Sequence, residues 1–174
     1  YQKIKTPNEL LMFMDKINYG YLSKSSKVYL NNDCYWYLEY ILENTSDILI
    51  TMTGNCFDQT ELERDWFTKN NYYVETYFEM VNLNYKNAYP THSFLIYKNM
   101  NKYCWLENAY QKYMGIHEYS SLNEALMDVK EKFILDLPSS FDSDYLKIYE
   151  YEAPNYNITA DEFFKETTKN PIDI

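Results

Sequence analysis

Three side chains in this sequence have the types and the order along the chain that nucleophilic acyl transfer requires. They are Cys56, His92 and Glu107. A cysteine nucleophile needs a neighbouring base to hold its proton, and the base needs a third group that orients it. A thiol, an imidazole and a carboxylate can fill these three roles, so the sequence predicts a cysteine-based catalytic triad.

The stretch around Cys56 has the features of an activated thiol. Gly54 lets the backbone turn sharply just before the cysteine, and Leu62, Trp66 and Phe67 recur after it at helical spacing. Cys56 therefore begins a predicted helix, whose N-terminus carries partial positive charge and free N–H groups. That position favours a thiolate. The alternative is a buried structural thiol, because free cysteines are often core residues.

Two predicted strands position the other two side chains. Residues 91–98 and 103–109 have strand patterns and are joined by a short turn. An antiparallel hairpin of this kind brings Glu107 or Asn108 near His92, where a carboxylate would select the imidazole tautomer and stabilise the imidazolium. The alternatives are a core histidine hydrogen-bonded to the backbone and an exposed strand carboxylate.

The order of these motifs resembles the transglutaminase-like branch of the papain-like cysteine enzymes. The strings GNC at 54–56, THSF at 91–94 and YCWLE at 103–107 fit the places where that family carries its cysteine, histidine and acid. Over residues 56–133 the chain is similar to small uncharacterised bacterial members of this superfamily. The resemblance implies an α+β fold with a papain/transglutaminase-like core. A helical N-terminal half would pack on an antiparallel β-sheet, as a single transglutaminase-like domain over residues 1–174.

The resemblance also implies a mechanism through a thioester, in which Cys56 attacks an amide carbonyl, His92 carries the proton and Glu107 orients His92. The family's usual acid is an aspartate in an Asp-Pro-Thr-like string, whereas this chain reads Glu107, Asn108 and Ala109. Either Glu107 or Asn108 takes that role, and we expect Glu107. The substrate would be a peptide or protein amide. Amidase, deamidase or peptidase activity is favoured over cross-linking, and no metal or organic cofactor is implied.

The same fold could instead be a catalytically inactive module that binds a protein partner. The chain has 21 tyrosines and a formal net charge of −10, and an aromatic, acidic surface suits such a partner. Under this alternative, the groove above Cys56 would be filled or the His92 ring would be turned away from it.

Further residues are candidates for the active-site cleft. The oxyanion would meet the backbone N–H of Cys56 and one more donor. Tyr19, Tyr21 and Trp36 are the candidates for that second donor. Gln59, in the first turn of the predicted helix, could point into the cleft.

Other polar and aromatic side chains are expected to be structural. His117 is expected in a loop, and Arg64 can pair with Glu61 one turn earlier on the helix. Trp66 and Trp105 are expected in the core.

Composition and charge exclude several classes of protein. The net charge of −10 and the absence of a basic block argue against a nucleic-acid binder. No apolar run reaches the roughly 18 residues that a membrane span needs. Three widely spaced cysteines indicate neither a disulfide framework nor a zinc site, and two histidines are too few for most histidine-rich metal sites. We therefore expect a reducing, cytoplasmic location, and the sequence leaves the oligomeric state open.

The remaining pattern predicts helices and strands in mixed order within one domain. Capping boxes at Thr6, Ser121 and Thr159 mark three helix starts. We expect helices near residues 7–17, 35–43, 56–69 and 122–135 and from 160 onward, strands at 72–81, 91–98, 103–109 and 145–152, a short extended piece at 19–22 and a connection at 82–90.

Overall fold

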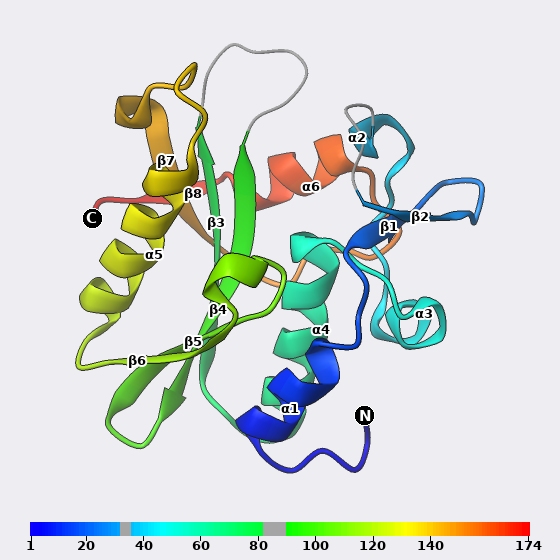
Figure 1. The fold of residues 1–174 in the computed structure, drawn as a ribbon, viewed down its shortest axis with the longest axis horizontal. Helices are drawn as coiled ribbons and strands as arrows, with labels where there is room; N and C mark the ends of the chain where they lie inside the picture. The colour runs from blue at the N-terminus through cyan, green and yellow to red at the C-terminus, as the bar shows by residue number, and fades with distance from the viewer. Residues whose placement is uncertain (32–35, 82–89) are drawn as a thin grey trace.

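A six-stranded antiparallel sheet lies at the centre of the fold (Figure 1). The computed structural model describes residues 1–31, 36–81 and 90–174. The strands lie in the order β6-β5-β4-β3-β7-β8, and every neighbouring pair is antiparallel. They span Val74–Val81 (β3), Thr91–Asn99 (β4), Lys102–Glu107 (β5), Gly115–Tyr119 (β6), Leu146–Tyr151 (β7) and Asn170–Ile172 (β8). The predicted α+β architecture with an antiparallel sheet is confirmed.

Helices cover both faces of this sheet. Helix α4 (Cys56–Lys69) packs on one face and α5 (Leu122–Asp136) packs on the other (Figure 1). The other elements are α1 (Pro7–Met14), α2 (Trp36–Glu39), α3 (Thr45–Thr51), α6 (Ala160–Thr167), the strand pair β1 (Gly20–Leu22) and β2 (Val28–Leu30), and two 3₁₀ helices, Gln111–Tyr113 and Ser143–Tyr145.

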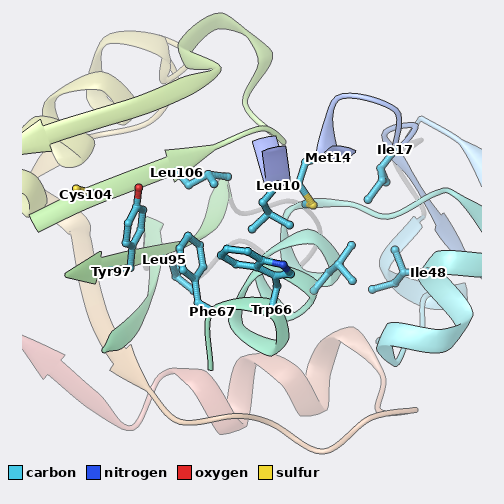
Figure 2. Close-up of a cluster of buried hydrophobic side chains, with 11 residues drawn as sticks. Leu10, Met14, Ile17, Ile48, Trp66, Phe67, Leu95, Tyr97, Cys104 and Leu106 are labelled. Carbon is cyan, nitrogen blue, oxygen red and sulfur yellow. The ribbon is translucent and has the colours of Figure 1, made fainter. Parts of the chain in front are cut away.

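The core on the α4 side holds that helix against the sheet (Figure 2). Trp66 and Phe67 of the helix are buried, and they pack in one cluster with Leu95 and Tyr97 of β4. The rings of Phe67 and Tyr97 stack with centroids 4.2 Å apart. Burying each large apolar side chain contributes about 1.5–3 kcal/mol. This packing anchors the body of α4, so its first residue is held at a defined place beside the sheet.

The opposite face of the sheet is covered by the apolar stripe of α5. Leu126 and Val129 pack there against Phe94 of β4 and Trp105 of β5. Strand side chains alternate between faces, so β4 and β5 contribute to both cores. The core positions expected for Trp66 and Trp105 are confirmed.

The predicted helix at 35–43 is wrong beyond its first turn. Helix α2 ends at Glu39, and Tyr35 lies outside the described residues. The chain after α2 pairs instead with distant backbone: the N–H of Ile41 donates to the Leu22 carbonyl at 3.2 Å, and the N–H of Leu42 donates to the Ile158 carbonyl at 2.8 Å. These long-range bonds and the burial of aromatic side chains outweigh the local helical pattern.

Two strands of the central sheet, and β2 outside it, were not expected from the pattern. β6 occupies the stretch predicted as a loop around His117, and β8 follows the last helix. Both are short and lie at the two edges of the sheet, where fewer side chains are buried and the hydrophobic alternation is weaker. Most of the expected connection at 82–90, and Cys34, lie outside the described residues.

The hairpin predicted to carry the imidazole and the acid is present. β4 and β5 pair from Leu95 with Leu106 to Asn99 with Lys102. Met100, in the turn, adopts a φ of 53°. In the described parts of the chain, none of the helices combines the length and apolar character that crossing a bilayer requires.

Candidate active site

The N-terminus of α4 is built by a reciprocal capping box around Cys56. The Asn55 side-chain oxygen accepts hydrogen bonds from the backbone N–H groups of Phe57, at 2.9 Å, and Asp58, at 3.5 Å. The Asp58 carboxylate in turn accepts from the Asn55 N–H at 3.1 Å. A Cβ on Gly54 would lie 2.8 Å from the Asp58 Cβ, so this close turn needs glycine. Cys56 is thereby fixed as the first residue of the helix.

Asp58 also ties this turn to the chain that precedes it. Its carboxylate accepts from the Tyr40 hydroxyl and from the Glu43 N–H, both at 2.9 Å. Burial raises the pKa of Asp58 to about 7, although these hydrogen bonds lower it. A fully buried carboxyl with three hydrogen-bond donors around it leaves the turn little freedom to move, which favours a precisely held thiol.

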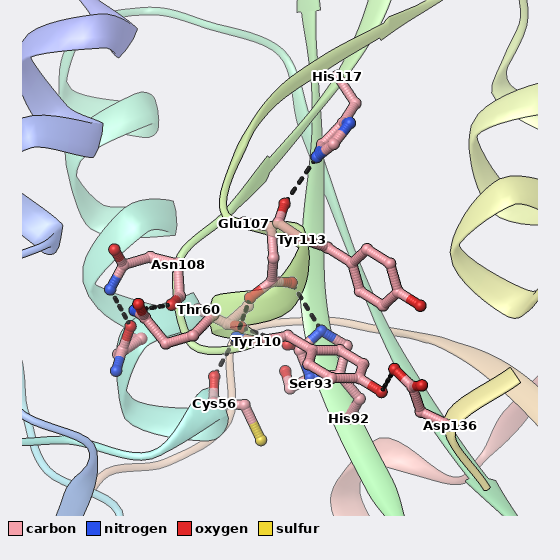
Figure 3. Close-up of polar contacts among 12 residues, drawn as sticks. Cys56, Thr60, His92, Ser93, Glu107, Asn108, Tyr110, Tyr113, His117 and Asp136 are labelled. Carbon is pink, nitrogen blue, oxygen red and sulfur yellow. Dashed lines mark hydrogen bonds and ion pairs between the residues drawn. The ribbon is translucent and has the colours of Figure 1, made fainter. Parts of the chain in front are cut away.

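A second contact joins α4 to the strand that carries the imidazole. The Thr60 hydroxyl, one turn into α4, lies 2.8 Å from the Cys56 carbonyl and 2.9 Å from the Ser93 carbonyl and bridges them (Figure 3). Ser93 follows His92 on β4. This bridge places the start of the helix next to the start of β4, and so brings the cysteine and the histidine together.

His92 and Glu107 form a buried pair on the β4–β5 hairpin. Nε2 of His92 lies 2.8 Å from a Glu107 carboxylate oxygen (Figure 3). The other carboxylate oxygen accepts the Tyr110 N–H at 2.6 Å. The two residues are 5% and 3% exposed. Glu107, and not Asn108, is therefore the side chain that contacts the imidazole in this structure.

The charges around His92 favour its protonated form. Burial alone lowers the pKa of His92, but the Glu107 charge and the hydrogen bonds with Cys56 and Glu107 raise it well above the usual value. Because Glu107 occupies Nε2, the other ring nitrogen, Nδ1, is the one left for the sulfur. A thiolate beside an imidazolium is the reactive state of a cysteine nucleophile.

Two adjoining cavities open beside the sulfur. Both are lined by Tyr19, Cys56 and Thr91. The first has a volume of about 180 Å³ and adds His92, Ala109, Tyr110 and Phe133. The second has a volume of about 250 Å³ and adds Trp36, Asn55, Phe57 and Pro90. A larger cavity of about 840 Å³, lined by the N-terminal residues and the end of α4, has no cysteine or histidine in its lining. We therefore place the candidate site at the two smaller cavities.

The structure separates the three aromatic candidates for an additional donor. Burial raises the pKa of Tyr19 well above its usual value, and so do the charge of Cys56 and its hydrogen bond with the Tyr19 side chain. Trp36 lines the second cavity and packs on Phe57 at 5.7 Å between ring centroids. Tyr21 is buried and stacks on Tyr29, with centroids 5.1 Å apart. Of the three, Tyr19 is the one that lines both cavities together with Cys56.

Gln59 and Asn108 form a buried network behind the site. The Gln59 side-chain N–H donates to the Gly54 carbonyl at 2.8 Å. The Asn108 side-chain N–H donates to the Gln59 side-chain oxygen at 2.8 Å and to the Met14 carbonyl at 3.0 Å. The suggestion that Gln59 points into the cleft is wrong, because its amide is engaged in the interior. The network links α1, the turn before Cys56 and the end of β5.

His117 and Arg64 also have structural partners. His117 lies on β6, not in the expected loop. Its ring stacks on Trp105 with centroids 4.8 Å apart, and Nε2 lies 2.7 Å from the Tyr113 carbonyl oxygen. Arg64 pairs with Glu61 at 3.0 Å, as the helical spacing predicts.

Two polar residues near the site were not singled out from the sequence. Asn55 is revealed by the capping box, and the string Asn-Cys-Phe-Asp carries the Asn-x-x-Asp signal for it. Glu79 pairs across the strands with His92 and is completely buried. A glutamate among aromatic and apolar residues of a predicted strand gives no comparable signal.

Among the described residues, no group of three or more His, Cys, Asp or Glu side chains is arranged to hold a metal ion.

Comparison with known proteins finds no match among family models, curated proteins or solved structures.

Proposed function

We propose that this protein is a transglutaminase-like cysteine enzyme that cleaves an amide through a thioester. The observation that carries the proposal is the buried His92–Glu107 pair, 2.8 Å apart, whose ring lines the same cavity as Cys56. Cys56 can act as the nucleophile, His92 as the base and Glu107 as the acid that orients the base.

The residues present can carry each step of the reaction. The Cys56 thiolate attacks the carbonyl carbon, and His92 donates its proton to the leaving nitrogen as the C–N bond breaks. Glu107 holds the ring through its hydrogen bond and stabilises the imidazolium. In the second half, His92 takes a proton from water, which attacks the thioester and releases the acid. General acid–base catalysis by a positioned imidazole contributes about 10²–10⁴-fold.

We propose a peptide or protein amide as the substrate and water as the acceptor. The two cavities, of about 180 and 250 Å³, are small for a ligand site. They suit a short extended segment or a side-chain amide. Water needs no binding site of its own, whereas an amine acceptor would need one beside the same cavities. Amidase, deamidase or peptidase activity is therefore preferred to cross-linking.

A catalytically inactive binding module of the same fold would leave a different geometry. It would fill the groove above Cys56 or turn the imidazole away. Instead, Cys56 lines two cavities, and the thiol contributes to the raised pKa of His92. These observations favour an enzyme.

The reactivity of the thiol tests the proposal. We expect iodoacetamide to alkylate Cys56 at least about tenfold faster than Cys104, which is buried on β5, as measured by mass spectrometry of the folded protein. His92→Ala should remove the difference, and Cys104→Ser should leave the Cys56 rate unchanged. Equal rates at the two cysteines in the wild type would contradict the proposal.

A further inference from the structure

Asn55 precedes Cys56, and only the oxygen of its side-chain amide is hydrogen-bonded among the described residues. Its oxygen caps α4 by accepting the Phe57 and Asp58 N–H groups. Because a cap needs an acceptor, this contact fixes which end of the amide is nitrogen. Asn55 is 1% exposed, and its Nδ2 has no hydrogen-bond partner among the described residues. A buried N–H group without a partner destabilises the folded state, so a functional reason for keeping it at this position is needed.

The residue that carries this nitrogen lines the cleft. Asn55 lines the cavity of about 250 Å³ together with Cys56, Tyr19 and Trp36. Cys56 is the first residue of α4, so its own backbone N–H has no acceptor within the helix. Two adjacent residues therefore offer hydrogen-bond donors beside one sulfur atom, at the positive end of a helix of 14 residues.

Tyr19 is the competing donor, and its situation is different. Tyr19 is 37% exposed, so its side chain is less confined than the amide of Asn55. The Asn55 nitrogen has no hydrogen-bond partner among the described residues, and the cap holds its amide in place. A donor that is rigid and unoccupied before the reaction is what electrostatic stabilisation of a transition state requires.

We propose that Nδ2 of Asn55 is a catalytic donor that binds the substrate's carbonyl oxygen as it becomes an oxyanion, together with the backbone N–H of Cys56. This inference rests on the proposed function. As the bond from the Cys56 sulfur to the carbonyl carbon forms, the π-electron pair moves to the oxygen, which accepts the two hydrogen bonds. When the C–N bond breaks, that pair returns to re-form the carbonyl, and the leaving nitrogen takes the proton of His92.

Two probes separate this role from a structural one. Acylation of Cys56 by p-nitrophenyl acetate passes through an oxyanion, whereas alkylation by iodoacetamide does not. Asn55→Ser keeps a side-chain oxygen for the cap and withdraws the amide donor. We expect it to lower the acylation rate constant by about 10²–10³-fold and to leave the alkylation rate within about twofold of wild type. Asn55→Asp keeps both the shape and the cap acceptor, and it should show an acylation loss at least as large.

A matched control lies at the start of α3. Asn44 caps that helix in the same way, accepting from Ser46 at 2.9 Å and Asp47 at 3.1 Å, and its nitrogen is already bonded to Asp47. Asn44→Ser should therefore leave both rates unchanged. Thermal unfolding of all three variants reports any loss of the caps themselves.

The outcomes distinguish the role of Asn55 from the proposed function of the protein. Acylation within about threefold of wild type in both Asn55 variants would overturn the inference, and so would an equal fall with both probes, which indicates loss of helix geometry. Those results leave the proposed function in place. Failure of wild-type Cys56 to react faster than Cys104 would instead overturn the proposed function.

Discussion

His92 and Glu107 meet on one face of the β4–β5 hairpin, with Nε2 and a carboxylate oxygen 2.8 Å apart. The register pairs Leu95 with Leu106. Because side chains alternate along strands, this register turns His92 and Glu107 to the same face, opposite to that of the two leucines. Both residues are buried, and His92 lines a cavity that Cys56 also lines. The candidate chemistry therefore depends on the register of one hairpin and on the place where α4 begins.

Glu107→Gln should uncouple the imidazole from the thiol. The Glu107 charge raises the pKa of His92, so the variant should protonate His92 only at lower pH and deplete the thiolate–imidazolium pair near neutrality. We expect acylation of Cys56 by p-nitrophenyl acetate to fall by about 10²–10⁴-fold, and the upper limb of the alkylation–pH profile to move to lower pH. Glu118→Gln, at an exposed position of β6, is the matched control. Superimposable profiles for the Glu107 variant and wild type would rule out the acid's role.

Asn108→Ala should damage the fold more than the chemistry. It removes two buried hydrogen bonds, to Gln59 and to the Met14 carbonyl. We expect the free energy of unfolding to drop by about 1–3 kcal/mol in a urea titration, while Cys56 alkylation stays within about threefold of wild type. Unchanged stability with abolished alkylation would make Asn108 the third catalytic member instead of Glu107.

Glu79→Gln should flatten the dependence of stability on pH. Neither carboxylate oxygen of Glu79 has a hydrogen-bond partner among the described residues, and burial raises its pKa to about 8, with Glu107 adding to the rise and His92 and Lys130 opposing it. The folded state thus holds this proton more tightly than the unfolded chain, whose glutamate titrates near 4.3. The stability that this group contributes is fully present below about pH 4 and is lost as the pH rises through about 8.

The measurement compares unfolding free energies at pH 5 and pH 8. The Glu79 variant should lose about 2–4 kcal/mol less than wild type over that interval. Glu150→Gln, at an exposed position of β7, should lose as much as wild type. If the Glu79 variant shows the full wild-type loss, the carboxyl is not the buried acid described here.

Arg64→Ala should leave a buried carboxylate without its counter-charge. Arg64 pairs with Glu61 at 3.0 Å, and its guanidinium lies 4.9 Å from the centroid of the Tyr151 ring. Burial raises the pKa of Glu61 to about 7, while Arg64 lowers it. Removing Arg64 should raise that pKa further and destabilise the fold by about 3 kcal/mol at pH 8, with a smaller loss at pH 5, where Glu61 is protonated. Lys69→Ala, which breaks an exposed pair with Asp65, should cost less than about 1 kcal/mol. Equal losses for the two variants would contradict this account.

Local chemistry in the sequence determined the helix starts and the hairpin. The Asn55–Asp58 and Thr159–Glu162 capping boxes formed where the residue types allow them, because a cap involves only neighbours within one turn. The strands at 91–98 and 103–109 could be predicted for a similar reason, since alternation is a property of the strand itself. The order of Cys56, His92 and Glu107 along the chain was sufficient to suggest the chemistry.

Long-range packing decided which side chains meet in the site, because contacts between neighbours in sequence do not determine this. Whether Glu107 or Asn108 meets His92 depends on strand register, and the choice among Tyr19, Tyr21 and Trp36 depends on how the N-terminal segments lie over α4. The helix expected at 35–43 gave way to bonds with Leu22 and Ile158. Such contacts join residues far apart in sequence, and their free energy comes from burial that exists only once the whole chain has folded. The residue types supplied the groups that could react, and the tertiary structure alone selected which of them face one another.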